Sequence, residues 1–158
     1  MTRQILINIL IAFIWMLLNE EFNPVLFGVG YIIGFVIIFT MRRFFTTPFY
    51  GRKVIAVIKL FLLFIVELFK SSIGVIKEVL RPTLKIKPGI FRAETILETD
   101  FEISILVSLI TLTPGSVVME IDSKAKVMYI HAMDSNDYQN NIRKAKRRFE
   151  KAIIEVMR

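Results

Sequence analysis

Ionisable side chains inside an apolar stretch are the residues best placed to do chemistry in this 158-residue chain. Lys59 and Glu67 interrupt an apolar run from Val54 to Phe69, and Lys70 follows it. Charged groups at membrane depth are costly, and those that are kept often relay ions or pair with another charge. We therefore take Lys59, Glu67 and Lys70 as candidates for an ion path or for charge pairing between subunits. Glu67 is the residue to test for cation or proton movement.

The helical spacing of these residues favours one of the two roles. Glu67 and Lys70 are three positions apart, so they can pair on one helix face. At 100° per residue the basic residues form one stripe, which comprises Arg52, Lys59, Lys70 and Lys77, with Arg81 nearby. The opposite face is apolar and comprises Ile55, Ile58, Leu62, Ile65, Phe69 and Ile76. Such a stripe favours a face in water or against another subunit over a relay.

Other reactive groups are sparse. Glu20 and Glu21 are adjacent carboxylates in a polar turn, which we interpret as solvated charges. His131 is the single histidine, and it alternates with Tyr129 on a predicted strand, so we interpret it as structural. Without cysteine a zinc site is not expected, and neither a phosphate loop nor a nucleophile elbow occurs in the sequence. We expect no enzyme, no metal and no cofactor.

The chain that positions these residues changes character at about residue 81. Two runs, Ile5–Leu18 and Val25–Met41, contain almost no polar residue, whereas the sequence after Arg81 mixes polar and apolar segments. This division predicts a membrane region over residues 1–81, with helices at about 3–19, 24–43 and 52–80. Residues 82–158 are expected to form a small cytoplasmic α/β domain.

The first two helices form a short hairpin. Fourteen helical residues cover about 21 Å, against a hydrocarbon core of about 30 Å. The hairpin must therefore thin the bilayer, be sheltered by other proteins or stop short of the far side. Gly30 and Gly34 form a Gly-x-x-x-Gly pair that permits close helix packing. Their contact is either with the first helix or with another subunit.

The third helix, with its charged stripe, has two placements open to it. It can cross the membrane with the stripe against a partner, or lie along the cytoplasmic interface. Residues 1–80 hold eight Lys or Arg and four Glu, and the whole chain has a net charge of +7. The basic clusters all lie inside if only the first two segments span, so we favour the interfacial placement. Contact with anionic lipid is expected, and nucleic-acid binding is not.

The second half is predicted to have the order β-α-β-β-α. The five expected elements are a strand over Thr83–Lys87, a helix from the capping box at Thr99 to about Leu112, strands Val117–Ile121 and Val127–Ala132 joined as a hairpin, and a helix over about Tyr138–Met157. The first crossover should be right-handed if the strands that it joins are parallel neighbours.

The last helix is expected to be amphipathic. Its apolar face comprises Ile142, Ala145, Phe149, Ile153 and Val156. Its other face is assigned the basic residues Arg143, Lys144, Lys146, Arg147, Lys151 and Arg158.

Three segments carry a resemblance to a known family. Leu112-Thr113-Pro114-Gly115-Ser116 is followed by Tyr129-Ile130-His131-Ala132-Met133-Asp134, and the first helix carries Ala12-x-x-Trp15-x-x-Leu18. Over essentially its whole length the chain resembles the E subunit of Mrp-type multisubunit Na+/H+ antiporters. That family typically has Thr where this chain has Ser116, which keeps the hydroxyl.

The resemblance implies a non-catalytic, multi-pass subunit of a plasma-membrane complex of about seven proteins. The complex would exchange intracellular Na+ for external H+, and this subunit would support its assembly, with the C-terminal domain in the cytoplasm. The alternative is a stand-alone membrane-anchored adaptor that binds anionic lipid or a cytosolic protein. An independent small transporter is disfavoured because so few spans cannot line a path.

Within the resembling segments, Thr113-Pro114-Gly115-Ser116 has a mechanical interpretation. Pro114 disfavours helical geometry at Thr113, and Gly115 permits a turn. The segment is therefore either a helix-to-strand corner alone or a corner that also docks on a neighbouring subunit. His131 belongs to the same structural or docking motif, and Trp15 is grouped with Gly30 and Gly34 in helix packing.

Overall fold

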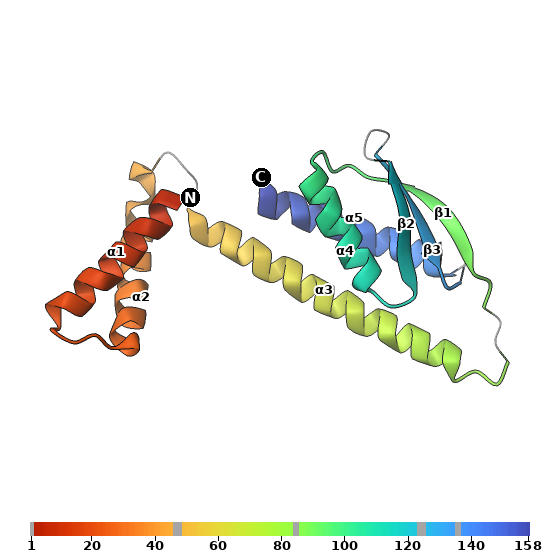
Figure 1. Cartoon of the computed structure of the whole chain (residues 1–158), viewed down its shortest axis with the longest axis horizontal. Helices are drawn as coiled ribbons and strands as arrows, with labels where there is room; N and C mark the ends of the chain where they lie inside the picture. The colour runs from red at the N-terminus through yellow and green to blue at the C-terminus, as the bar shows by residue number, and fades with distance from the viewer. Residues whose placement is uncertain (1, 46–48, 84–85, 123–125, 135–136) are drawn as a thin grey trace. The chain divides into compact units, whose positions relative to one another are not determined.

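A computed structural model describes residues 2–45, 49–83, 86–122, 126–134 and 137–158. The elements in chain order are α1 (Thr2–Leu18), α2 (Pro24–Thr40), the 3-10 helix η1 (Met41–Phe44), α3 (Tyr50–Val79), β1 (Gly89–Glu94), α4 (Asp100–Leu112), β2 (Ser116–Asp122), β3 (Val127–Ala132) and α5 (Asp137–Met157) (Figure 1). The chain divides into two compact units, Met1–Ile55 and Ala56–Arg158.

The first unit contains the helical hairpin of α1 and α2 and the first turn of α3. The side chain of Asn23 accepts a hydrogen bond from the Val25 N–H at 2.9 Å, and Pro24 is the first residue of α2. A side-chain cap followed by proline is a common start of a helix, so the predicted start of the second helix is confirmed.

Within the described residues, one helical stretch is long and apolar enough to cross a membrane. It runs from Pro24 to Phe44 and combines α2 with η1. Helix α1 is also apolar but has only 17 residues. The prediction of a short first helix is therefore confirmed.

The second unit contains a three-stranded antiparallel sheet in the order β1-β3-β2. Helices α4 and α5 both pack on one face of this sheet (Figure 1). The core between them is built from Phe91, Ala93, Leu97, Ile103, Leu106, Ile110, Met128, Ile130, Ala132, Ile142, Phe149 and Ile153. Strands β1 and β2 are parallel to each other, but β3 lies between them. The right-handed crossover was expected only for parallel strands that are neighbours, so that expectation does not apply.

Two sequence predictions for this unit are confirmed. The Thr99 side chain accepts from the Glu102 N–H at 3.2 Å, and Glu102 Oε2 accepts from the Thr99 N–H at 3.2 Å. This reciprocal capping box starts α4 where the sequence indicated. Strands β2 and β3 form the predicted antiparallel hairpin, although residues 123–125 of its connection lie outside the described residues.

The position of the first strand was predicted wrongly. The strand begins at Gly89 rather than ending before it, and residues 84–85 of the predicted segment Thr83–Lys87 lie outside the described residues. The alternation that forms the strand is in Gly89–Glu94, where Phe91 and Ala93 are buried against the helices. Gly89 pairs with Ala132 at the end of β3, so this glycine opens a strand instead of terminating one.

Helix α3 continues into the second unit with two distinct sides. Leu60, Leu63 and Phe64 pack against the core of the α/β elements. The other side, which we call the outer apolar face, is uncovered and comprises Ile55, Ile58, Phe61, Leu62, Phe69, Ile73, Ile76 and Val79. The face predicted to be apolar is therefore the face that the rest of the unit leaves open.

Candidate functional site

The three ionisable residues singled out in the apolar run all form ion pairs within the second unit. Glu67 Oε1 lies 2.7 Å from Arg148 Nη1 and 3.7 Å from Lys70 Nζ. Lys59 Nζ lies 3.0 Å from Glu155 Oε1. The predicted contact of Glu67 with Lys70 is present, but the shorter contact is with Arg148 of α5.

Sequence reasoning missed the α5 partners, and the two pairs differ in exposure. The Glu67 side chain is 12% exposed, whereas Lys59 and Glu155 are both more than half exposed. Exposed ion pairs contribute about 0–1 kcal/mol, because solvent screens them. Glu67 is thus the better shielded of the two carboxylates, and it joins α3 to α5. The basic face of α5 was the signal that such carboxylates would have partners there.

The hydroxyl groups of the Thr113–Ser116 corner form hydrogen bonds within the same chain. The Thr113 hydroxyl donates to the Leu109 carbonyl at 2.7 Å, and the Ser116 hydroxyl donates to the Ile110 carbonyl at 3.1 Å. The Leu109 carbonyl lies in the last turn of α4, where carbonyl groups lack a donor inside the helix. The Ile110 carbonyl also accepts from the Thr113 N–H at 3.2 Å. Gly115 has φ of 90°, in the left-handed region that favours glycine.

The same corner contacts α3 and the end of β3. The Ser71 hydroxyl of α3 donates to the Pro114 carbonyl. The Met133 N–H donates to the Gly115 carbonyl at 3.0 Å, and Ser116 pairs with Ala132 across the sheet. The structure therefore brings together two of the three sequence segments that carry the family resemblance.

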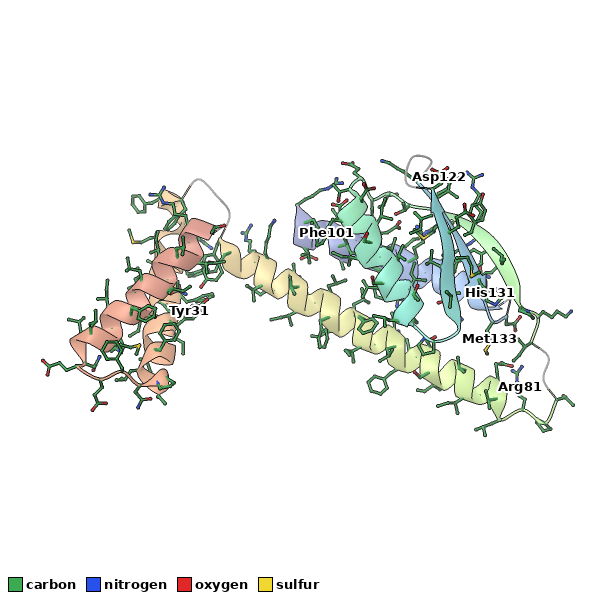
Figure 2. All side chains as sticks on the ribbon, in the orientation of Figure 1. Tyr31, Arg81, Phe101, Asp122, His131 and Met133 are labelled. Carbon is green, nitrogen blue, oxygen red and sulfur yellow. The ribbon has the colours of Figure 1, made fainter. Side chains whose placement is uncertain are left out.

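His131 lies in β3, next to this corner. Figure 2 labels His131 at the strands of the sheet. The residue pairs across the sheet with Val117 of β2 and with Ile90 of β1. Its neighbours Ile130 and Ala132 are buried under the helices, and His131 alternates with them, so its side chain lies on the other face of the sheet. Ile90 and Val117 are exposed on that face.

The glycine pair of α2 faces α1 of the same chain. A methyl group added at Gly30 would lie 2.8 Å from Trp15 Cβ and 2.9 Å from the Ala12 Cα. A methyl group at Gly34 would collide with the Asn8 side chain, whereas Gly28 has open space. The sequence allowed the glycine pair to contact either the first helix or another subunit. In the structure the pair contacts the first helix, and Trp15 takes part in this contact.

The hairpin also buries polar groups that sequence reasoning did not single out. Asn8 Nδ2 donates to the Tyr50 hydroxyl at 2.7 Å, and Gln4 Oε1 accepts from the Tyr50 N–H at 2.9 Å. Asn8 Oδ1 and Trp15 Nε1 are buried without a hydrogen-bond partner among the described residues. A signal was available, because Gln4 and Asn8 are four apart on the helix, as are the buried Ala12 and Met16.

Two buried charged clusters stabilise the α/β elements. Lys146 Nζ lies 2.6 Å from Glu150 Oε1, which also accepts from the Thr95 hydroxyl at 2.7 Å and from the Ile96 N–H at 3.2 Å. Lys146 is only 6% exposed, so its assignment to the water-facing side of the last helix was wrong. Its position four residues after Ile142 and three before Phe149 places it on the buried side.

Glu102 is the other buried carboxylate, with an exposed fraction of 3%. The backbone N–H groups of Glu98 and Thr99 donate to it and hold its pKa below the ordinary value. Burial opposes this shift, and nearby Arg158 adds to it. Within the described residues no group of three or more His, Cys, Asp or Glu is arranged to hold a metal ion.

A helical hairpin with one stretch long and apolar enough to cross a membrane, a long amphipathic helix and a small α/β unit are the features of a membrane protein with an appended α/β part. A family model described as a Na+/H+ ion antiporter subunit (MNHE) matches residues 8–156. The chain is 48% identical to the E subunit of the Na(+)/H(+) antiporter of Bacillus subtilis, over all of both chains. It is 45% identical to that of Alkalihalophilus pseudofirmus, with 99% of each chain covered.

Among solved structures, the chain is similar to one in the membrane-bound sulfane sulfur reductase, an archaeal respiratory membrane complex. The TM-score is 0.56 and the identity 25%, with 97% of this chain and 98% of the other covered. The chain belongs to the MNHE family, the E subunits of Na+/H+ antiporters. The predicted family is thus confirmed, and with it the assignment as an antiporter subunit rather than an enzyme.

Proposed function

We propose that this chain is a non-catalytic subunit of an Mrp-type Na+/H+ antiporter complex of about seven proteins in the plasma membrane, where it supports assembly and cation/proton exchange. The full-length similarity to the E subunits of two antiporters carries the proposal. A chain of similar fold also belongs to a respiratory membrane complex, which fits a role as one subunit among several.

The exposed apolar surface supports an assembly role. Helices α1 and α2 leave large apolar side chains uncovered over most of their length, and α3 adds its outer apolar face. Exposed apolar patches larger than a few hundred Å² mark protein or membrane contacts. One side of such surfaces would meet lipid, and the remainder would meet neighbouring subunits.

We place α3 along the cytoplasmic interface, with its outer apolar face in the lipid. The helix is amphipathic along its length, which is typical of helices that lie in the interface. Its carboxylates Glu67 and Glu78 are paired with Arg148 and Arg81, so no unpaired carboxylate of α3 has to enter the hydrocarbon. The basic remainder of the chain then stays on the cytoplasmic side, as the positive-inside rule favours.

We further propose that Thr113–Ser116 and His131 form the docking end of the α/β part. The corner and the end of β3 are hydrogen-bonded together, and exposed Ile90 and Val117 lie beside His131. This combination of a fixed corner and an uncovered apolar surface suits contact with another subunit. Lys59, Glu67 and Lys70 would act by holding α5 against α3 rather than by relaying an ion.

Co-purification tests the proposal. The tagged chain, extracted from native membranes in mild detergent, should bring the other antiporter subunits in stoichiometric amounts. Vesicles from a strain without this chain should lose Na+/H+ exchange and regain it on re-expression. Recovery of the chain as a monomer, with exchange unaffected by its loss, would favour the adaptor instead.

Glu67→Gln separates the structural role of the α3 charges from an ion path. If Glu67 serves only to hold α5, the variant should lower the amount of assembled complex while the apparent Na+ affinity of the assembled fraction stays unchanged. A shifted Na+ affinity at normal assembly would assign Glu67 to the ion path. Glu94→Gln, which breaks the exposed pair with Arg92 within β1, is the matched control.

A further inference from the structure

A basic cleft in the second unit has no ligand in the function proposed above, although Thr113 and Ser116 of the proposed docking end line part of it. It has a volume of about 400 Å³ and lies between the second half of α3, the Thr113–Ser116 corner and the first half of α5. Ligand pockets commonly measure about 300–1,000 Å³. The Ser71–Pro114 hydrogen bond holds α3 to the corner at one wall, and Gly74 leaves the adjoining wall without a side chain.

The charges that line the cleft are unbalanced. Five cations line it, namely Lys70, Lys77, Arg81, Lys144 and Arg148, against the two carboxylates Glu67 and Glu78. Glu67 is shared by Arg148 and Lys70, and Glu78 lies 2.8 Å from Arg81. Within the described residues, neither Lys77 nor Lys144 has a carboxylate within ion-pair distance. These two ammonium groups come from different helices and line the same hollow.

We infer that this cleft binds a phosphate-bearing anion between Lys77 and Lys144. Ammonium groups form strong charge-assisted hydrogen bonds with phosphate oxygens, and lysine is a common phosphate ligand. Asn141 also lines the cleft, and its side-chain amide can provide a further donor. Net positive charge in a concave site also concentrates anions from solution.

The lining limits the kind of molecule that carries the phosphate. Among the residues that the structure describes, no aromatic side chain lines the cleft, so a nucleobase would have no ring on which to stack. Lys70 and Lys77 lie at the border between the outer apolar face and the side covered by α5. A lipid phosphate at the membrane surface and a small soluble phosphate therefore both meet the same donors.

Titration of the full chain in detergent distinguishes the two sources. One arm adds inorganic phosphate or glycerol phosphate and measures binding by calorimetry. A second arm measures binding to vesicles of phosphatidylglycerol mixed with phosphatidylcholine, with pure phosphatidylcholine as reference. Saturable binding in the first arm identifies a soluble ligand, and binding in the second arm alone identifies a lipid headgroup.

The variant Lys77→Gln/Lys144→Gln should weaken binding about a hundredfold, since each of the two lost bonds to a charged group contributes a factor of about ten. Arg147→Gln/Lys151→Gln removes the same charge from exposed positions of α5 outside the cleft and should leave binding within about twofold of wild type. Lys77→Arg/Lys144→Arg keeps the charge and should retain binding, so a loss through misfolding is recognisable.

Three outcomes would overturn the inference. They are no saturable binding in either arm, equal weakening by the cleft and control variants, and cross-linking of Lys77 or Lys144 to an acidic segment of another subunit in the intact complex. The last outcome would assign the cleft to a protein partner. None of them bears on family membership or on co-purification with the antiporter subunits.

Discussion

The side-chain amide of Asn8 donates a hydrogen bond of 2.7 Å to the hydroxyl of Tyr50, and both residues are buried. One turn earlier on α1, Gln4 accepts from the N–H of the same tyrosine. The first turn of α3 is thus attached to α1 through two side chains, and Gln4 satisfies an N–H group that a helix start leaves without an internal partner.

Removing the Tyr50 hydroxyl should destabilise the hairpin. Tyr50→Phe leaves the Asn8 amide buried without this partner, and an unsatisfied buried polar group costs about 1–3 kcal/mol. We expect a lower thermal midpoint in detergent, followed by the fluorescence of Trp15, the single tryptophan of the chain. Tyr129→Phe, at a half-exposed position of the sheet, should not move that midpoint.

Adding a methyl group at Gly30 should separate α1 from α2. The new Cβ would press on the Ala12 backbone, which cannot move aside as a flexible side chain can. Overpacking of this kind costs about 1–3 kcal/mol. Gly28→Ala meets open space and should be neutral or slightly stabilising, since alanine is favoured over glycine in helices by about 1 kcal/mol. Equal effects of the two variants on Trp15 fluorescence melting would contradict the packing assigned to Gly30.

Breaking the buried pair of α5 should cost far more than breaking an exposed one. Glu150→Gln leaves the Lys146 charge buried, and loss of one partner from a buried pair costs about 3–5 kcal/mol. Glu155→Gln breaks an exposed pair and should cost about 0–1 kcal/mol. Hydrogen exchange of the β3 amides measures both. Comparable protection in the two variants would show that Lys146 finds another partner or reaches water.

The pKa of Glu102 gives the α/β part a defined response to acid. The N–H groups of Glu98 and Thr99 favour the ionised carboxylate, so its pKa in the folded chain lies below its ordinary value of 4.5. The resulting stability is fully present above about pH 4.5 and is lost as the pH falls toward the folded pKa. Wild type should therefore be more stable than Glu102→Gln near neutral pH.

The difference between wild type and Glu102→Gln should shrink on acidification from about pH 6 to about pH 3, because the carboxylate becomes protonated. Denaturant unfolding of the full chain at each pH measures it. If the difference in stability stays constant over this range, Glu102 stabilises the fold by something other than its negative charge.

What the sequence predicted well was local. The capping box at Thr99, the start of α2 at Pro24 and the β2–β3 hairpin depend on residues within a few positions of each other. Both faces of α3 also follow from periodicity alone, since the apolar positions recur at helical spacing. Family membership could be recognised because its motif residues are contiguous.

What the sequence did not predict depends on contacts between distant segments. The strand at Gly89–Glu94 is fixed by pairing with β3, which lies nearly forty residues later, and the preceding segment Thr83–Lys87 alternates just as well. Burial of Lys146 depends on Thr95 and Ile96, which share its partner Glu150. The ion pair from Glu67 to Arg148 likewise spans 81 positions. From their charge alone, such residues would be predicted to be exposed to solvent.

The strand order β1-β3-β2 also determines when the sheet can form during synthesis of the chain. Among the residues that the structure describes, β1 and β2 pair only with β3, so neither has a hydrogen-bonded neighbour until β3, the last of the three to be synthesised, has left the ribosome. By then the apolar hairpin has long emerged and has been available for insertion. A translation product that stops before Val127 would thus carry the apolar hairpin of α1 and α2 without the sheet formed by β1, β3 and β2.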